Sequence, residues 1–353
     1  MVLLFVIGCH RSGTSLLASL LRDTIQHDVT PAQPDLPIAL DNPRGFFESQ
    51  KLQNLNDELL RSIDSAWDHP PVLPPNWSLK QRVDQFCALR SLFSKEALQT
   101  RWIDKDPRLC ITYGAYAHIL LRRVAIAAII RDPLDVATSL YFRNAFPIKQ
   151  GLAIWYLYNH HLAFHLQDGD QIWDYHRMLQ LKHADQEIAA ALISFNKSLE
   201  QVGCPSIDSD QFKRLIQKHI APELNRSGSS APESATWTTN ESGLAKICKQ
   251  AYANWQSSSN PIQAWKEEFG SIPFELSQLL SAERWYVKES LPDTIKYKEV
   301  IKEIKEKESK LERLCSEQRD KILQLEQKLT DIQESSSWRI SKPLRWLGDC
   351  LKK

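Results

Sequence analysis

The sequence predicts an α/β fold, with a parallel sheet flanked by helices and followed by a C-terminal coiled-coil helix. Two short apolar runs that end in turn or charge signals, residues 3–7 and 125–130, are typical of strands covered on both faces by helices. Over residues 301–332, apolar positions follow one heptad register within a sequence dense in lysine and glutamate, which predicts the coiled coil. Because Glu308 and Gln318 interrupt that register, a single long solvated helix is the alternative.

Length and composition limit the classes of function. A chain of 353 residues that is 42% hydrophobic can bury one large core and still carry an appendage. The 44 basic and 43 acidic residues leave a net charge of +1, so no global field attracts nucleic acid, and anion binding must be local. Seven cysteines without a C-x-x-C pair favour a reducing cytosol over a disulfide framework. No apolar run approaches the roughly 20 residues that span a membrane.

Helices are predicted where apolar residues recur at intervals of three and four. These stretches are residues 50–63, 80–98, 152–166 and 188–199. Residues 64–78 are rich in proline and contain Trp67 and Trp77, so they predict a rigid aromatic loop suited to the rim of a substrate site.

Changes in composition divide the chain into five segments. They are a core over 1–226, a flexible Ser/Thr/Pro-rich insertion over 227–242, a helical extension over 243–290, the coiled coil over 291–334 and a basic aromatic tail over 335–353. The coiled coil favours self-association. The tail suits the inner face of a membrane or a partner surface, but Pro343 interrupts any long amphipathic helix, so packing on its own domain is the alternative.

The first candidate site is the loop of residues 8–15, GCHRSGTS, which lies between a predicted strand and an apolar helix. In that context backbone N–H groups wrap a phosphate, and glycines at both ends of the loop allow the wrap. The glycine spacing is that of a Walker A loop, but Thr14 occupies the place of its lysine. Arg11 supplies the cation instead, and can stabilise charge on a leaving oxygen.

The second candidate site follows the predicted strand 125–130. Asp132 suits the N-cap of a helix, with Pro133 at its first position and Asp135 as a capping-box partner. Arg131 then lies at the strand's carboxyl end, where open α/β sheets bind ligands, although an ion pair with a neighbouring acid is the alternative. Two anion sites on one sheet imply a ligand with two separated anionic groups. A nucleotide with a 5′-phosphosulfate and a 3′-phosphate meets this requirement, whereas ATP does not.

The motifs G-x-x-R-S-G-T-S and R-D-P-x-D-V-x-x-S resemble the two binding motifs for 3′-phosphoadenosine 5′-phosphosulfate (PAPS) in the sulfotransferase family, including bacterial carbohydrate sulfotransferases. The resemblance covers about the first 200 residues. It implies a P-loop-like fold and metal-free, in-line sulfuryl transfer. The residues it assigns are Arg11, Ser12, Gly13, Thr14 and Ser15 to the 5′-phosphosulfate, and Arg131 and Ser139 to the 3′-phosphate.

A third segment, IWDYHRML at residues 172–179, resembles the family's Y-E-D-L segment, whose tyrosine lies near the adenine. The resemblance therefore implies that Tyr175 binds the nucleotide base. His176 and Arg177 replace the acidic pair of that segment, which is a departure from the family's pattern.

Transfer to a hydroxyl needs a general base. We favour Glu48, because relatives with a glutamate base place it between the first helix and the next element. Asp41 and His10 are rivals, and Glu48 could instead favour a helix N-terminus. Lys105 resembles the lysine of a Lys-x-Pro segment in some carbohydrate sulfotransferases and would face the sulfuryl group or acceptor. Its alternative is an ion pair with neighbouring Asp104 or Asp106.

The aromatic loop could stack on sugar rings, so the expected acceptor is a glycan or glycolipid hydroxyl. Two other classes of function stay open: a P-loop kinase or NTPase, disfavoured by Thr14, and a non-catalytic interaction protein with a degenerate nucleotide fold. His161 and His165 have the spacing of a metal pair, and His160 adjoins them, but without a third ligand we expect solvated helix histidines and no metal.

Overall fold

The computed structural model describes residues 2–24, 47–77, 101–120, 123–183, 185–220 and 239–282, with scattered residues between 317 and 331. The chain divides into two units, 1–286 and 287–353, and the elements named below belong to the first. The tail and the predicted helix 80–98 lie outside the described residues. So does most of the predicted coiled coil, of which only scattered helical residues are described.

Within the described residues, four parallel strands form one sheet in the order β2-β1-β3-β4. They are β1 (Val2–Ile7), β2 (Arg101–Lys105), β3 (Ala125–Ile130) and β4 (Gln171–Asp174). Val6 lies opposite Lys105 on one side and Ala127 on the other, and Ile130 lies opposite Asp174. The register therefore brings the carboxyl ends of all four strands to one edge of the sheet. This confirms the predicted fold class of a parallel α/β sheet flanked by helices.

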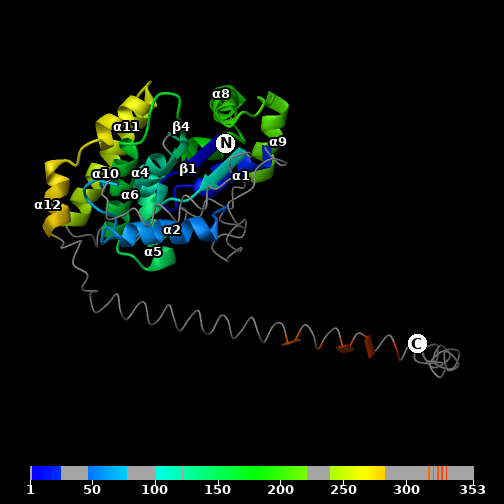
Figure 1. Ribbon diagram of the computed structural model, residues 1–353, viewed down its shortest axis with the longest axis horizontal. Coiled ribbons are helices and arrows are strands. Elements are labelled where there is room, and N and C mark those ends of the chain that lie inside the picture. Colours follow the sequence, from blue (N-terminus) through cyan, green and yellow to red (C-terminus); the bar gives the residue numbers. More distant parts are fainter. Residues whose placement is uncertain are drawn as a thin grey trace, which may run out of the picture. The chain divides into compact units, whose positions relative to one another are not determined.

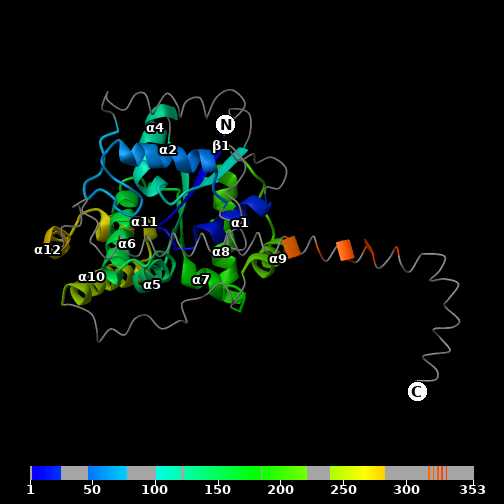
Figure 2. The same cartoon turned by 90° about the horizontal axis from the view of Figure 1, so that it is seen from below.

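Helices cover both faces of the sheet. They are α1 (Thr14–Thr24), α2 (Gln50–Arg61), α4 (Leu109–Leu120), α5 (Pro133–Asn144), α6 (Ile148–Ala163), α7 (Tyr175–Gln180), α8 (Asp185–Gln201), α9 (Ser209–His219), α10 (Thr239–Ser257), α11 (Pro261–Phe269) and α12 (Phe274–Ala282). Phe5 and Ile7 pack with α2, α4, α6, α10 and α11, whereas Leu4 and Val6 pack with α1, α8 and α9. Figures 1 and 2 show α8 and α9 on one side of β1 and α10 and α12 on the other. Strand side chains point alternately to the two faces, so both faces of β1 are buried.

The start of α5 differs in one detail from the prediction. Asp132 caps the helix through Oδ1, which accepts from the backbone N–H groups of Leu134 and Asp135 at 2.8 and 3.2 Å, and Pro133 holds the first position. The Asp135 side chain does not complete a capping box. Its Oδ2 lies 3.3 Å from Nε of Arg131, because the guanidinium is a stronger partner than an amide N–H at that edge. The ion pair restrains Arg131 at the strand end.

The expectation that His160, His161 and His165 are solvated is wrong, and His165, just after α6, is half-buried. His160 and His161 are buried, because α4, α5, α10 and α11 all contact this helix. His160 donates from Nδ1 to the Phe269 carbonyl and His161 donates from Nε2 to the Pro71 carbonyl, each at 2.6 Å. Within the described ranges no group of three His, Cys, Asp or Glu side chains could hold a metal ion. No helix described there is long and apolar enough to cross a membrane.

Buried His161 predicts sensitivity to acid. Burial lowers its pKa to about 3, so the folded protein excludes a proton that the unfolded chain binds below about pH 6.5. Stability therefore falls as the pH drops below 6.5, and this one residue should account for about 2 kcal/mol between pH 8 and pH 5. The free energy of unfolding, measured with denaturant at pH 8 and pH 5, should differ between the two pH values by about 2 kcal/mol less in His161→Gln than in the wild type. The same change at exposed His176 is the control, and equal effects of both substitutions would contradict the assignment.

Candidate active site

The candidate site lies where the four parallel strands end. The loop of residues 8–13 follows β1, Arg131 follows β3, and Tyr175 follows β4, while Lys105 is the last residue of β2. Open α/β sheets bind ligands at this edge, in the crevice outside the carboxyl ends of the strands. The predicted site residues of the two motifs and of β2 and β4 are thus gathered by the sheet itself.

The loop after β1 is tightly wound. The N–H of Ser12 donates to the Cys9 carbonyl at 3.1 Å, and Arg11 and Gly13 have left-handed backbones with φ of 68° and 94°. A Cβ at Gly13 would lie 2.2 Å from Cδ2 of Tyr175, so only glycine fits there. The Tyr175 ring therefore packs directly on the loop, and Thr14 and Ser15 begin α1 immediately after it.

The two predicted anion motifs join in one site. Nε of Arg11 donates to Oγ of Ser139 at 2.9 Å, and Nη1 of Arg131 donates to the backbone carbonyl of Arg11 at 3.1 Å. The Arg131 guanidinium also lies 4.6 Å from the centroid of the Tyr175 ring, which is cation–π distance. Arg131 thus forms an ion pair with Asp135, which is the alternative that the sequence left open. It also contacts the first motif through the Arg11 carbonyl.

Two buried polar atoms of the loop have no hydrogen-bond partner among the described residues. They are Oγ of Ser12, whose residue is fully buried, and Nε2 of His10. Unpartnered buried polar atoms are rare in folded proteins, since each costs the free energy of its lost hydration. Both lie in the loop expected to wrap an anion, so this segment fits a ligand that offers hydrogen-bonding oxygens.

His10 is surrounded by aromatic rings and positively charged side chains. Its ring lies 4.7 Å from that of Trp67 and 5.3 Å from that of Tyr158. Burial lowers the pKa of His10 well below its usual value, and nearby cations lower it further, in the order Arg108, Arg143, Lys105 and Arg11. His10 is therefore neutral near pH 7, among cations of a protein that carries almost no net charge.

Glu48 and Lys105 form a buried ion pair, from Nζ of Lys105 to Oε1 of Glu48. The alternative pairing of Lys105 with Asp104 or Asp106 is therefore wrong. Burial raises the pKa of the Glu48 carboxyl, and the Lys105 ammonium offsets part of that rise. Glu48 does not cap α2, because the N-cap is Ser49, whose Oγ accepts from the Leu52 N–H. The rival base Asp41 lies outside the described residues.

A polar network that the sequence analysis missed supports this pair. Arg108 donates from Nε to Asp57 at 2.6 Å and from Nη1 to Asp106 at 3.1 Å, and Asn56 donates to the other oxygen of Asp106 at 2.8 Å. Asp106 and Arg108 also act electrostatically on Glu48. The available signal was the charged D-K-D-P-R run of residues 104–108, which begins within β2. The partners on α2 carry no such signal, because they are about 50 residues away in the chain.

The two tryptophans of the predicted aromatic rim lie in different surroundings, and the prediction is wrong for Trp77. Trp77 is 6% exposed, donates from Nε1 to the Ile111 carbonyl at 3.2 Å and packs against Gly114, so it belongs to the core and cannot stack on a ligand. A tryptophan ring buries its large apolar area in a core when its N–H has a hydrogen-bond partner there. Trp67 is half-buried, lies beside His10 and stacks on Phe146 at 5.6 Å between ring centroids.

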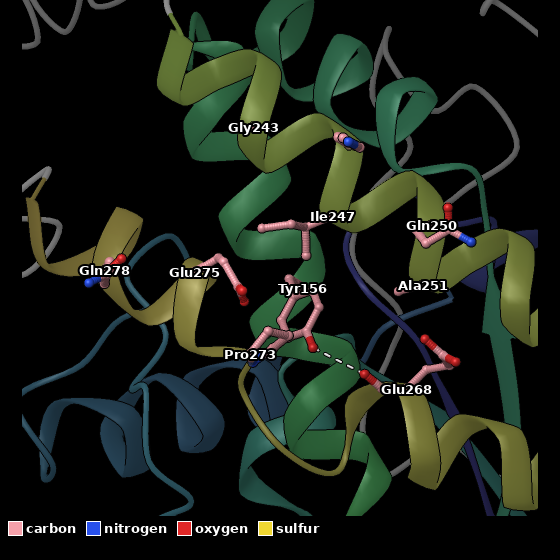
Figure 3. Close-up of a pocket in the computed structure, with 10 residues that line it drawn as sticks. Tyr156, Gly243, Ile247, Gln250, Ala251, Glu268, Pro273, Glu275 and Gln278 are labelled. Carbon is pink, nitrogen blue, oxygen red and sulfur yellow. Dashed lines mark hydrogen bonds between the residues drawn. The ribbon is translucent and has the colours of Figure 1, made fainter.

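A separate pocket lies away from these residues. Its volume is about 680 Å³, and it is lined by residues of α6, α10, α11 and α12 and the segment between the last two, among them Tyr156, Ile247, Ala251 and Pro273. Figure 3 shows Tyr156 among these side chains, with its hydroxyl hydrogen-bonded to Glu268. No residue of the two anion motifs lines it.

No protein-family model and no curated protein matches this chain. Among solved structures, the chain is similar to the sulfotransferase domain from the Synechococcus PCC 7002 olefin synthase, with 16% identity and a TM-score of 0.35 over 82% of this chain and 95% of that chain. It is also similar to the sulfotransferase domain from the curacin biosynthetic pathway, with 14% identity and a TM-score of 0.34 over 79% of this chain and 96% of that chain. Similarity at this level assigns no activity to the chain.

Proposed function

We propose that the chain is a sulfotransferase that moves a sulfuryl group from PAPS to an acceptor hydroxyl. The observation that carries the proposal is the meeting of two cationic motifs in one site, where Arg11 binds Ser139 and Arg131 binds the Arg11 carbonyl. A ligand that uses both motifs needs two separated anionic groups, and PAPS carries two such groups on one nucleoside. The resemblance of both motifs to PAPS-binding motifs supports the same donor.

The proposal assigns the loop of residues 11–15 to the 5′-phosphosulfate, and Arg131 and Ser139 to the 3′-phosphate. Backbone N–H groups at the start of α1 and the unpartnered Ser12 hydroxyl suit an anion with several oxygens. Tyr175 offers its ring to the adenine beside Arg131. Arginine suits these roles because its planar guanidinium binds two oxygens of one phosphate or sulfate at once.

The proposed chemistry is an in-line displacement. The acceptor oxygen forms a bond to sulfur while the bond from sulfur to the bridging oxygen breaks, which gives a sulfated acceptor and adenosine 3′,5′-bisphosphate. Glu48 takes the acceptor proton, and the electron pair of the broken bond stays on the bridging oxygen, where Arg11 stabilises it. Lys105 holds Glu48 in place and contributes positive charge beside the sulfuryl group.

The proposal is tested by thermal unfolding with adenosine 3′,5′-bisphosphate. A ligand at 100 times its Kd stabilises the folded state by about 2.7 kcal/mol, which raises the Tm of a protein of this size by about 4 °C. Adenosine 5′-monophosphate, which lacks the 3′-phosphate, should give a smaller shift. No shift at millimolar bisphosphate would contradict the proposed donor. Magnesium-dependent ATP turnover would instead favour a kinase or NTPase.

The proposed acceptor is a hydroxyl of a glycan or glycolipid. This part of the proposal now depends on Trp67 alone, whose half-buried ring beside His10 could contact the face of a sugar. Radiolabelled PAPS incubated with the protein and a cell-envelope extract should place label in polysaccharide or lipid. Label that enters only protein would contradict the acceptor class and leave the donor untouched.

A further inference from the structure

The carboxylate of Asp174, at the end of β4, is held from two sides. Its Oδ1 accepts from the backbone N–H of Arg177 at 3.0 Å and so caps α7. Its Oδ2 accepts from the Tyr252 hydroxyl at 2.9 Å and from Nε2 of Gln256 at 2.7 Å. Asp174 is buried, so both donors on α10 satisfy a group that would otherwise lose its hydration.

The residue that Asp174 fixes is its neighbour Tyr175. The Tyr175 ring fills the space beside Gly13 and lies under the Arg131 guanidinium. A small rotation of the first turn of α7 would therefore move the ring away from both anion motifs. The hydrogen bonds to Asp174 oppose that rotation.

A second path leads from α10 to the same site. The Tyr252 ring lies edge-on to Trp155 at 6.5 Å between centroids, and Nε1 of Trp155 donates to the backbone carbonyl of Arg131 at 2.9 Å. The rings of Trp255 and Tyr252 stack with their centroids 6.1 Å apart. Burial and the Asp174 carboxylate raise the pKa of Tyr252, so its hydroxyl stays a donor at any physiological pH. Tyr252 thus supports Tyr175 through Asp174. It also lies beside Trp155, which donates to the backbone carbonyl of Arg131.

We propose that Tyr252 and Gln256 are positioning residues for the nucleotide half of the site, acting through Asp174 on Tyr175. The inference rests on the proposed function, and it brings α10 into a site that the sequence motifs confine to the first 180 residues or so. Both side chains donate their hydrogen bonds to Asp174, and Asp132 and Asp135 of the second motif act on Tyr252 only electrostatically. Their effect is therefore on donor binding and not on the transfer step.

The test is the double variant Tyr252→Phe, Gln256→Met, which removes both donors and keeps the side-chain volumes. Calorimetric titration should show adenosine 3′,5′-bisphosphate bound at least about tenfold more weakly, and the KM for PAPS should rise by a similar factor. The kcat at saturating PAPS should change less than about twofold, because the reacting groups are untouched. Hydrogen exchange of the α7 amides in the free protein should become faster.

The matched control is Tyr156→Phe. It also removes a buried tyrosine hydroxyl, which donates to the carbonyls of Glu268 and Ser271 at 3.1 and 3.2 Å beside the pocket of Figure 3. Bisphosphate binding and α7 exchange should match the wild type in this variant.

The outcomes separate the two proposals. If the wild type binds the bisphosphate and the double variant binds it equally well, with unchanged α7 exchange, the positioning role is wrong and the donor assignment stands. If the wild type binds no bisphosphate but the double variant exchanges faster at α7, the donor assignment is wrong and the link from α10 to Tyr175 stands. If the double variant and Tyr156→Phe lost bisphosphate binding equally, the loss would reflect lower overall stability, and the positioning role would be wrong.

Discussion

Arg11→Asn is expected to slow sulfuryl transfer by about 10³-fold, the cost of removing a cation from developing charge in a buried site. Asparagine is the substitution of choice because residue 11 has a φ of 68°, and asparagine tolerates the left-handed region better than alanine does. The change removes the guanidinium that contacts Ser139 and preserves the backbone carbonyl that accepts from Arg131. Transfer is measured as formation of adenosine 3′,5′-bisphosphate under saturating donor.

Arg11→Lys is the matched control for that loss. Lysine keeps the positive charge but cannot reproduce the planar fork of the guanidinium, so we expect a smaller loss, about tenfold. Circular dichroism and the Tm should stay close to the wild type in both variants, since Arg11 is only partly buried. Full activity in Arg11→Asn would show that the cation beside the leaving oxygen is another residue, and Lys105 would be the next to test.

The parts of the site that local sequence signals specify were predictable. A strand covered on both faces is a continuous apolar run, and the loops that follow β1 and β3 show their glycines, proline and cap residues within a few positions. Parallel strands bring their carboxyl ends to one edge, so Arg11 and Arg131 were expected near the same crevice. The structure adds that they share a hydrogen bond, which no local pattern specifies.

What the sequence did not show depends on long-range packing. Trp77 looked like a loop residue because prolines surround it, but the Ile111 carbonyl gives its indole N–H a buried partner. His161 looked solvated because a histidine on a helix usually is, but α6 has further helices packed against it on several sides. The α10 donors to Asp174 come from about 80 residues along the chain, beyond the reach of periodicity or motif spacing.

Glu48→Gln is expected to reduce transfer by about 10²- to 10⁴-fold while the folded protein binds the bisphosphate as the wild type does, because a general base contributes to the transfer step. The substitution also leaves the buried Lys105 ammonium without its partner, so the free energy of unfolding should fall. Burial raises the pKa of the Glu48 carboxyl, so the rate should rise with pH through that raised pKa, as the base loses its proton. That acid limb should be absent from the residual activity of Glu48→Gln. A limb that survives the substitution would assign the base to another group, with His10 and Asp41 as the candidates.

Lys105→Met separates the catalytic from the structural role of the pair. Removing one partner of a buried ion pair leaves the other charge uncompensated, which costs about 3–5 kcal/mol, so this variant should unfold at markedly lower denaturant. Adding Glu48→Gln removes the stranded charge, and the double variant should regain much of the lost stability. Transfer should stay low in both, since stability returns without a base. If activity returned together with stability in the double variant, Glu48 and Lys105 would be structural residues and the base would lie elsewhere.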